Sequence, residues 1–152
     1  MVLEIRKATL SDVAAVALLF DAYRVFYNQK SDLPAAFDFL SQRISNGESA
    51  VFIALLGGET VGFVQLYPIF SSVSLKRAWL LNDLFVAEKA RLQGIAEALL
   101  EQAKEHGVET GAAWILLQTG NDNYRAQSVY EKNGWVKVSD FFYEYSLIPS
   151  NH

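Results

Sequence analysis

Apolar side chains recur at strand or helix intervals along most of this sequence. Residues 2–8 alternate weakly between apolar and polar side chains, which predicts a first strand. The segment Thr9-Leu-Ser-Asp12 has the spacing of a capping box, which is typical of a helix start. A helix is expected from there through about residue 27, with its apolar stripe at Val13, Val16, Ala17, Phe20, Tyr23 and Tyr27.

A second helix and three strands are predicted next. The helix begins at Ser31 or Asp32, has Pro34 in its first turn and ends at Asn46-Gly47. Gly57-Gly58 tolerates the positive φ of a tight hairpin turn and separates the first two strands. The three strands are strongly apolar and are expected to pair antiparallel: residues 50–56, 60–67 and 79–86.

The second half of the chain predicts two helices and three more strands. The first helix ends at Gly107 or Gly111 and has its apolar stripe at Ile95, Leu99, Ala103 and His106. Residues 112–117 are continuously apolar, as expected of a strand that is covered on both faces and runs parallel to its predecessor. The chain closes with a helix that Gly134 ends and with two strands, at residues 123–133, 135–139 and 142–147.

The element order is therefore β-α-α-β-β-β-α-β-α-β-β. This order predicts an α/β (α+β) architecture, with a mixed central sheet of about six to seven strands and four helices. The length of 152 residues fits one domain, which we expect to span residues 1–152.

Composition excludes several classes of function. Thirteen Lys and Arg against 17 Asp and Glu give a net charge of −4, which argues against a general nucleic-acid binder. Zero cysteines exclude a thiolate nucleophile, and two histidines are too few for a His-rich metal site. The first residues lack the apolar core of a signal peptide, and no run of 18 apolar residues occurs. A cytoplasmic protein without a membrane partner is expected.

One segment, residues 83–100, combines a strand, a short loop with Arg91 and Gly94, and the start of a helix. Such a segment directs free backbone N–H groups and the positive end of the helix dipole at one point, which suits a pyrophosphate. Arg91 adds a fork of donors. The single glycine matches neither the dinucleotide fingerprint nor the P-loop, so an ordinary loop before a helix explains this segment equally well.

Two motifs in this half of the chain resemble the GNAT superfamily of acyl-CoA-dependent N-acetyltransferases. Arg91-Leu-Gln-Gly94-Ile-Ala96 resembles its Arg/Gln-x-x-Gly-x-Gly/Ala signature. Asn123-Tyr-Arg-Ala-Gln-Ser-Val-Tyr130-Glu-Lys-Asn-Gly-Trp135 resembles its later Asn-x-x-Ala-x-x-x-Tyr-Glu-Lys-x-Gly-Phe segment. The departures are mild, since Ala96 replaces the commoner Gly and Trp135 the usual Phe. The resemblance also covers the element order of the whole chain.

The resemblance implies that acetyl-CoA is the acyl donor. In such enzymes the pantetheine arm lies where the two central parallel strands separate, and a backbone N–H near Val86 polarises the thioester carbonyl. Tyr130 protonates the departing thiolate, because a phenol is protonated at neutral pH. The cofactor-binding residues implied are Leu84, Phe85, Val86, Arg91, Leu92, Gln93, Gly94, Ile95, Ala96, Asn123 and Tyr130.

Some of these residues also have ordinary structural explanations. Tyr130 has the spacing of a core residue in its helix, and Asn123 suits a helix N-cap. His106 and His152 lack the motif of a catalytic triad, and we expect them at solvated or C-terminal helix positions.

The acceptor is expected to be an amine. The region from residue 61 to residue 86 is similar to polyamine acetyltransferases, and it looks equally like the subgroup related to yeast histone and polyamine acetyltransferases. The polyamine enzymes have two adjacent acidic residues where this chain has Asn82-Asp83. Aromatic faces suit a cationic head group, although Tyr23 and Tyr27 can equally be core residues. The candidate acceptor-binding residues are Tyr23, Tyr27, Tyr67, Phe70 and Asn82.

Asp83 is the candidate for the group that receives or relays the proton of the acceptor amine, because it lies three residues before Val86. Alternation along a strand predicts that Asn82 and Asp83 point to opposite faces. Asp83 can also fix a neighbouring loop by hydrogen bonding, with a water chain ending elsewhere as the proton path.

The sequence therefore predicts an N-acetyltransferase that moves the acetyl group of acetyl-CoA directly to a primary amine. A small molecule such as a polyamine or amino acid is favoured, while a lysine side chain, a protein N-terminus or an aminoglycoside stays open. The alternative is a non-catalytic acyl-CoA-binding sensor or scaffold of the same fold. The aromatic residues Phe141, Phe142, Tyr143 and Tyr145 near the end of the chain predict a homodimer.

Overall fold

The computed structural model describes residues 1–149, which divide into two compact units, Met1–Gln118 and a second unit that begins at Thr119. The first unit contains, in chain order, β1 (Leu3–Lys7), a 3-10 turn η1 (Leu10–Asp12), α1 (Val13–Phe26), α2 (Leu33–Ser45), β2 (Ala50–Leu56), β3 (Glu59–Ser71), β4 (Lys76–Val86), a second 3-10 turn η2 (Glu88–Ala90), α3 (Ile95–Glu109) and β5 (Ile115–Leu117). The described part of the second unit contains one helix, α4 (Tyr124–Lys132).

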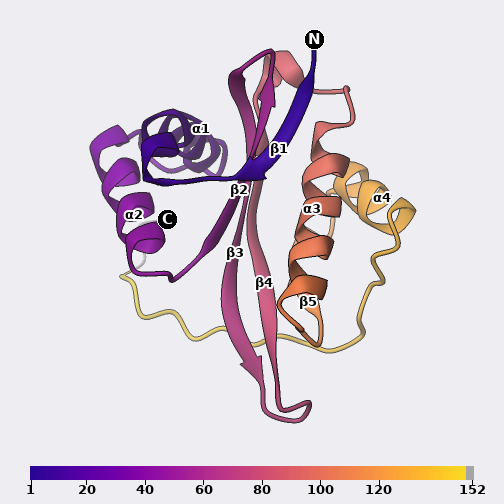
Figure 1. The fold of residues 1–152 in the computed structure, drawn as a ribbon. Helices are drawn as coiled ribbons and strands as arrows, with labels where there is room; N and C mark the ends of the chain where they lie inside the picture. The colour runs from indigo at the N-terminus through magenta and orange to yellow at the C-terminus, as the bar shows by residue number, and fades with distance from the viewer. Residues whose placement is uncertain (150–152) are drawn as a thin grey trace. The chain divides into compact units, whose positions relative to one another are not determined.

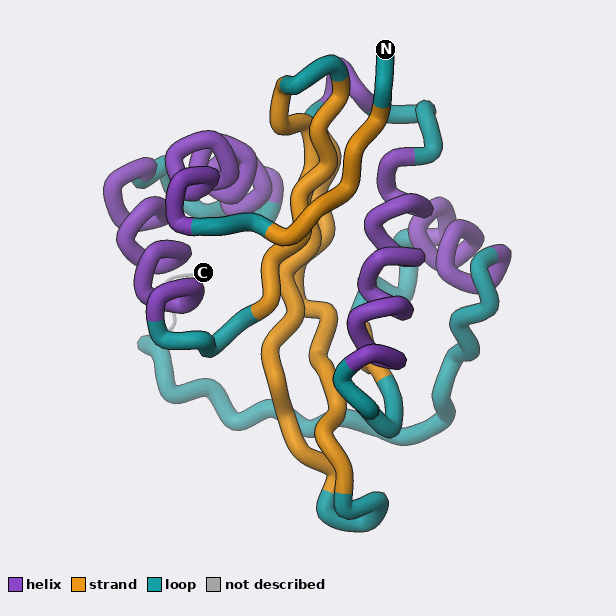
Figure 2. The backbone as a smooth tube through the Cα atoms, in the orientation of Figure 1, coloured by secondary structure: helices purple, strands orange, loops and turns teal. Residues whose placement is uncertain are grey.

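The first unit is built on one mixed sheet with strand order β1-β2-β3-β4-β5. The first four strands pair antiparallel, and β5 pairs parallel with β4. Helices α1 and α2 cover one face of this sheet and α3 covers the other (Figure 1). The long hairpin of β3 and β4 extends past the other strands (Figure 2). Strand β4 therefore lies between an antiparallel and a parallel neighbour.

The main apolar cluster lies between the sheet and helices α1 and α2. Its most buried members have zero exposure and come from both helices and two strands: Val16, Ala17, Leu40, Ile53 and Phe63. Burying one of the Val, Leu, Ile or Phe side chains among them contributes roughly 1.5–3 kcal/mol. This cluster fixes the first helix against the strands that hold the candidate site.

On the other face, Gly62 lets α3 approach the sheet closely. A Cβ atom at this position would lie 3.1 Å from the Phe85 carbonyl oxygen and 3.3 Å from Leu99 Cδ1. These distances are shorter than ordinary contacts, so a side chain here would push α3 away from β4. The glycine in β3 thus determines how near the start of α3 comes to the end of β4.

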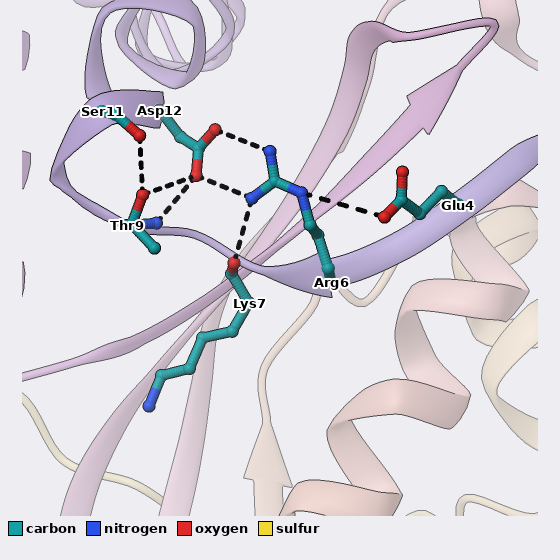
Figure 3. Close-up of polar contacts among 6 residues, drawn as sticks. All are labelled: Glu4, Arg6, Lys7, Thr9, Ser11 and Asp12. Carbon is teal, nitrogen blue, oxygen red and sulfur yellow. Dashed lines mark hydrogen bonds and ion pairs between the residues drawn. The ribbon is translucent and has the colours of Figure 1, made fainter.

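The start of the first helix is held by an ion pair with β1 (Figure 3). Arg6 donates from Nη1 and Nη2 to the two oxygens of Asp12, at 2.8 and 2.9 Å. The Asp12 carboxylate also accepts from the Thr9 N–H at 2.8 Å, which is the reciprocal bond of the predicted capping box. These hydrogen bonds hold the pKa of Asp12 well below its usual range. The predicted helix start is confirmed.

Most predicted elements are present, with shifted ends. Asp32 rather than Ser31 caps α2, because its side chain accepts from the Ala35 N–H at 3.2 Å. Gly111, with φ of +68°, follows the end of α3, whereas Gly107 lies inside the helix. Strand β5 spans three residues instead of six, and its side chains are only partly buried.

The two predicted closing strands, residues 135–139 and 142–147, are wrong, and within residues 1–149 the sheet has five strands rather than six to seven. A strand needs a neighbouring backbone to pair with its N–H and C=O groups, and apolar composition does not provide one. Among the described residues this stretch has no such partner. Its aromatic side chains are exposed: Phe141, Phe142, Tyr143 and Tyr145.

No helix within residues 1–149 is both long and apolar enough to cross a membrane.

Candidate functional site

The end of β4 presents backbone groups to an open edge. The Ala87 N–H donates to the Val61 carbonyl at 2.7 Å, so this pair is a hydrogen-bonded pair of the β3–β4 ladder. Hydrogen-bonded and non-hydrogen-bonded pairs alternate in an antiparallel ladder. The N–H and C=O groups of Leu84 and Val86, which face Val64 and Gly62 in the register, therefore point away from β3.

Strand β5 does not fill that edge. Among the described residues, β5 pairs with β4 only at Trp79, Leu80 and Leu81. At the open edge, the Arg91 side chain donates a hydrogen bond from Nε to the Val86 carbonyl at 3.0 Å. An extended ligand can add to such an edge as a strand does. The predicted separation of the parallel strands thus begins directly after Leu81.

The loop that follows β4 exposes the start of α3. Arg91, Leu92, Gln93 and Gly94 are exposed, and Leu92 and Gly94 have φ of +64° and +77°. Gly94 is the N-cap residue and has no side chain to cap the helix. The first N–H groups of α3 and the positive end of its dipole are thus available to an anion. The guanidinium of Arg91 lies 5.5 Å from the Phe85 ring centre.

The site uses backbone more than side chains at the start of this helix. Ile95 is 2% exposed, because its side chain belongs to the packing beside Gly62. Arg91 donates one of its five N–H groups to the Val86 carbonyl, and the other four allow the predicted anion contact.

Strand β4 has a bulge at Asn82, immediately before this edge. Gln65 pairs with Asp83 and Leu66 pairs with Leu81, so Asn82 has no partner on β3. The expectation that Asn82 and Asp83 simply point to opposite faces misses this bulge. Asn82 is exposed and Asp83 is buried, yet Asn82 Nδ2 donates to Asp83 Oδ1 at 3.0 Å. The extra residue bends the strand and brings the two side chains together.

Asp83 is a buried carboxyl group, 4% exposed, on the sheet face covered by α1. Its Oδ2 accepts from Gln65 Nε2 at 2.8 Å. Burial raises the pKa of Asp83, and hydrogen bonds from Gln65, Tyr23 and Asn82 partly oppose the effect. A carboxyl group with a raised pKa is suited to accept a proton near neutral pH.

Aromatic rings surround this carboxyl group. Tyr23 donates from its hydroxyl to the Asn82 carbonyl at 3.3 Å, and its ring lies 6.0 Å from Phe63 and 6.0 Å from Phe85. Burial and the charge of Asp83 raise the pKa of Tyr67 to about 12, so its hydroxyl stays protonated.

The other two predicted acceptor aromatics differ in their surroundings. The ring of Tyr27 lies 5.0 Å from that of Tyr23, at the end of α1. Phe70 is exposed, and its ring contacts the Arg77 guanidinium at 5.3 Å near the β3–β4 turn. Tyr27 therefore contacts Tyr23, one of the residues around Asp83, whereas Phe70 lies near the tip of the β3–β4 hairpin.

The second unit contains the two remaining predicted residues. Asn123 caps α4, because its side chain accepts from the Ala126 N–H at 3.2 Å. Tyr130 is partly buried, and its ring centre lies 6.3 Å from that of Trp135. The capping explanation of Asn123 is confirmed, and the cofactor and proton-donor roles of the two residues stay predictions.

Sequence reasoning missed Gln65 and placed His106 correctly near the C-terminal end of its helix. Gln65 is fully buried, and the available signal was one polar residue inside the apolar segment 61–67. His106 lies in the last turn of α3, which is the C-terminal helix position of the two that were expected, and it is buried, with its ring centre 4.4 Å from that of Trp79. Burial lowers its pKa. His152 lies outside the described residues, which contain no group of three metal-ligating side chains.

Comparison with known proteins gives one consistent result. The family profile described as "Acetyltransferase (GNAT) family" matches residues 14–135. An uncharacterized N-acetyltransferase of Bacillus subtilis (strain 168), YhfO, is 47% identical over 148 residues, which cover 97% of this chain and 99% of the relative. A probable acetyltransferase of Haemophilus influenzae is 33% identical over 93% of this chain and 96% of its own length. A crystal structure of a probable acetyltransferase superposes with a TM-score of 0.88, at 42% identity over 98% of this chain and 99% of the other.

The burial of Asp83 predicts a measurable effect on stability. Because its pKa is higher in the folded state, its ionisation destabilises the folded protein as the pH rises above about 3.8, the ordinary value. Asp83→Asn keeps an acceptor for Gln65 and removes the buried charge. We expect a higher Tm than the parent near neutral pH and a smaller difference as the pH falls toward 4.

Thermal unfolding followed by circular dichroism across this pH range measures the effect. Asp38→Asn changes an exposed carboxylate on α2 and serves as the matched control, with no expected change in Tm. A Tm of Asp83→Asn below that of the parent at neutral pH would show that the ionised carboxylate stabilises the fold.

Proposed function

The chain belongs to the GNAT family of acetyltransferases, whose acyl donor is acetyl-CoA, and from this premise we propose that it transfers the acetyl group directly to the primary amine of a small molecule. One observation supports this proposal above the others. A single strand, β4, provides both an open backbone edge at Leu84 and Val86 and a buried carboxyl group at Asp83.

The residues present fit acetyl-CoA. The open edge of β4 offers N–H and C=O groups that an extended pantetheine arm, with its two amides, can pair with. Residues 91–96 offer Arg91 and the N–H groups at the start of α3 to the pyrophosphate. Asn123 is proposed as a further cofactor contact. A backbone N–H near Val86 is proposed to stabilise negative charge on the carbonyl oxygen.

The proposed transfer needs three proton movements. An acceptor ammonium loses one proton to the Asp83 carboxylate, and the free amine then forms the new N–C bond as the C–S bond of the thioester breaks. Tyr130 donates its phenolic proton to the sulfur that leaves, and the second proton that the acylated nitrogen loses restores the Tyr130 phenol. Since the chain has no cysteine, no acyl-cysteine intermediate is formed.

The acceptor is proposed to be small because Asp83 is almost fully buried. Tyr23 and Phe85 lie on the same side of the sheet, and their rings suit the cationic head group of an amine. A panel of amines, with release of free CoA as the readout, tests this proposal. Acetylation of only large protein substrates would contradict the small-molecule part.

We also propose a homodimer. The exposed aromatic side chains of Phe141, Phe142 and Tyr143 form more apolar surface than a monomer usually leaves in water. Light scattering should give twice the 17.0 kDa mass of one chain at micromolar concentration. A monomer mass would contradict the proposal.

Gly94→Glu tests the pyrophosphate site. The change places a negative side chain at the start of α3, and an added Cβ meets no atom within 4 Å, so only charge and the positive φ are at issue. We expect acetyl-CoA affinity, measured by isothermal titration, to fall by roughly 100-fold.

Gly47→Glu is the matched control, since Gly47 has φ of +64° and equally open space. It should bear the same backbone strain and keep the parent affinity. Full acetyl-CoA affinity in a folded Gly94→Glu protein would mean that the site is misplaced.

Tyr130→Phe tests the proton donor, because only a hydroxyl is lost. Turnover at saturating acceptor should fall by roughly 10- to 1000-fold, with acetyl-CoA affinity nearly unchanged. Tyr124→Phe, on the same helix, is the control and should behave as the parent. Unaltered turnover in Tyr130→Phe would return Tyr130 to the role of a packing residue.

A further inference from the structure

Gln65 is a polar side chain buried in an apolar strand, directly opposite the candidate base. It is 0% exposed, and its neighbours in β3, Val64 and Leu66, are equally buried apolar residues. Its Nε2 donates to Asp83 Oδ2 at 2.8 Å. Burial of an amide is unfavourable unless its polar atoms are hydrogen-bonded. A glutamine at this position therefore destabilises the fold relative to an apolar residue of the same size.

The other polar atom of Gln65 has no partner. Its Oε1 is buried and accepts no hydrogen bond in the structure. Buried acceptors of this kind are uncommon in native proteins. Here the unsatisfied carbonyl oxygen belongs to the side chain that holds the Asp83 carboxylate. Together they form a pair of acceptors, one charged and one neutral, suited to a ligand with several N–H donors.

We propose that Gln65 and Asp83 together bind the ammonium group of the acceptor, and that Gln65 is the positioning residue that orients Asp83 for proton removal. The inference rests on the proposed acetyl transfer and names its acceptor more closely. One N–H of the ammonium donates to Gln65 Oε1, and another donates to the Asp83 carboxylate, which then takes that proton. Asn82, exposed and in contact with Asp83, marks the side of entry.

The surroundings of this pair select a single positive charge. The side chains that hydrogen-bond to Asp83, from Gln65, Asn82 and Tyr23, are all neutral. A second ammonium group would therefore find no second carboxylate among the described side chains that hydrogen-bond to Asp83. The acceptor is a singly charged primary amine with an apolar body.

Gln65→Met removes both amide functions at nearly constant size. The KM for the amine should rise by roughly 10-fold or more, as expected when a hydrogen bond to a charged group is lost. The acidic limb of the pH–rate profile should also move to higher pH, because a donor that lowers the pKa of Asp83 is gone. The Kd for acetyl-CoA should stay at the parent value. Gln102→Met on α3 is the control and should change none of these.

Gln65→Glu provides a second test if the methionine variant fails to fold. It keeps the size and adds a carboxyl group beside Asp83, which should move preference toward a doubly charged acceptor. Pentylamine and cadaverine share one carbon chain and differ by one amine, so the ratio of their kcat/KM values reports this preference. The parent should favour pentylamine, and Gln65→Glu should shift the ratio toward cadaverine.

An unchanged KM and pH profile in Gln65→Met would overturn the role of Gln65, as would an unchanged ratio in Gln65→Glu. A parent protein that prefers cadaverine would overturn the single-charge selection. A parent that binds acetyl-CoA and acetylates no amine would instead overturn the proposed function.

Discussion

The bulge at Asn82 in β4 is the constraint on which the rest of the site depends. Leu81 is the last residue that pairs on both sides, with Leu66 of β3 and with Leu117 of β5. One extra residue then bends the strand, β5 ends, and Asp83 lies buried on the face covered by α1. The buried carboxyl group and the open edge therefore both lie directly after this irregularity along β4. Gly62 completes this arrangement by allowing the start of α3 to lie close to the same strand end.

Two opposing effects determine the protonation state of the Asp83 carboxyl group. Burial favours the protonated form, whereas hydrogen bonds from neutral amides favour the ionised form. The amides of Gln65 and Asn82 are neutral and do not form an ion pair with the carboxylate. Its negative charge can therefore pair with a positively charged ligand. A fully paired salt bridge at this position would instead hold the carboxylate ionised and occupied, as Arg6 does for Asp12 in the same unit. The two aspartates thus show the difference between a structural and a chemically available carboxylate.

Local patterns predicted the elements well where the signal lies within the segment. The capping box at Thr9 and Asp12, the N-cap at Asp32 and the stop at Gly111 each depend on bonds between near neighbours. The strands at 135–139 and 142–147 failed because pairing depends on a distant backbone that the local pattern does not specify. Asp83 was predicted, while Gln65 was missed because its importance comes from register, which only the bulge defines.

The pH dependence of kcat/KM for Asp83→Asn, compared with the parent for the same small amine, tests the central claim most directly. If Asp83 accepts the proton of the acceptor, the variant should retain its fold and acetyl-CoA affinity. Its rate should fall most at low pH, where free amine is scarcest, by roughly 100-fold as expected for the loss of a general base. A pH–rate profile indistinguishable from that of the parent would contradict the account, because the buried carboxyl group beside the open edge would then have no part in the transfer.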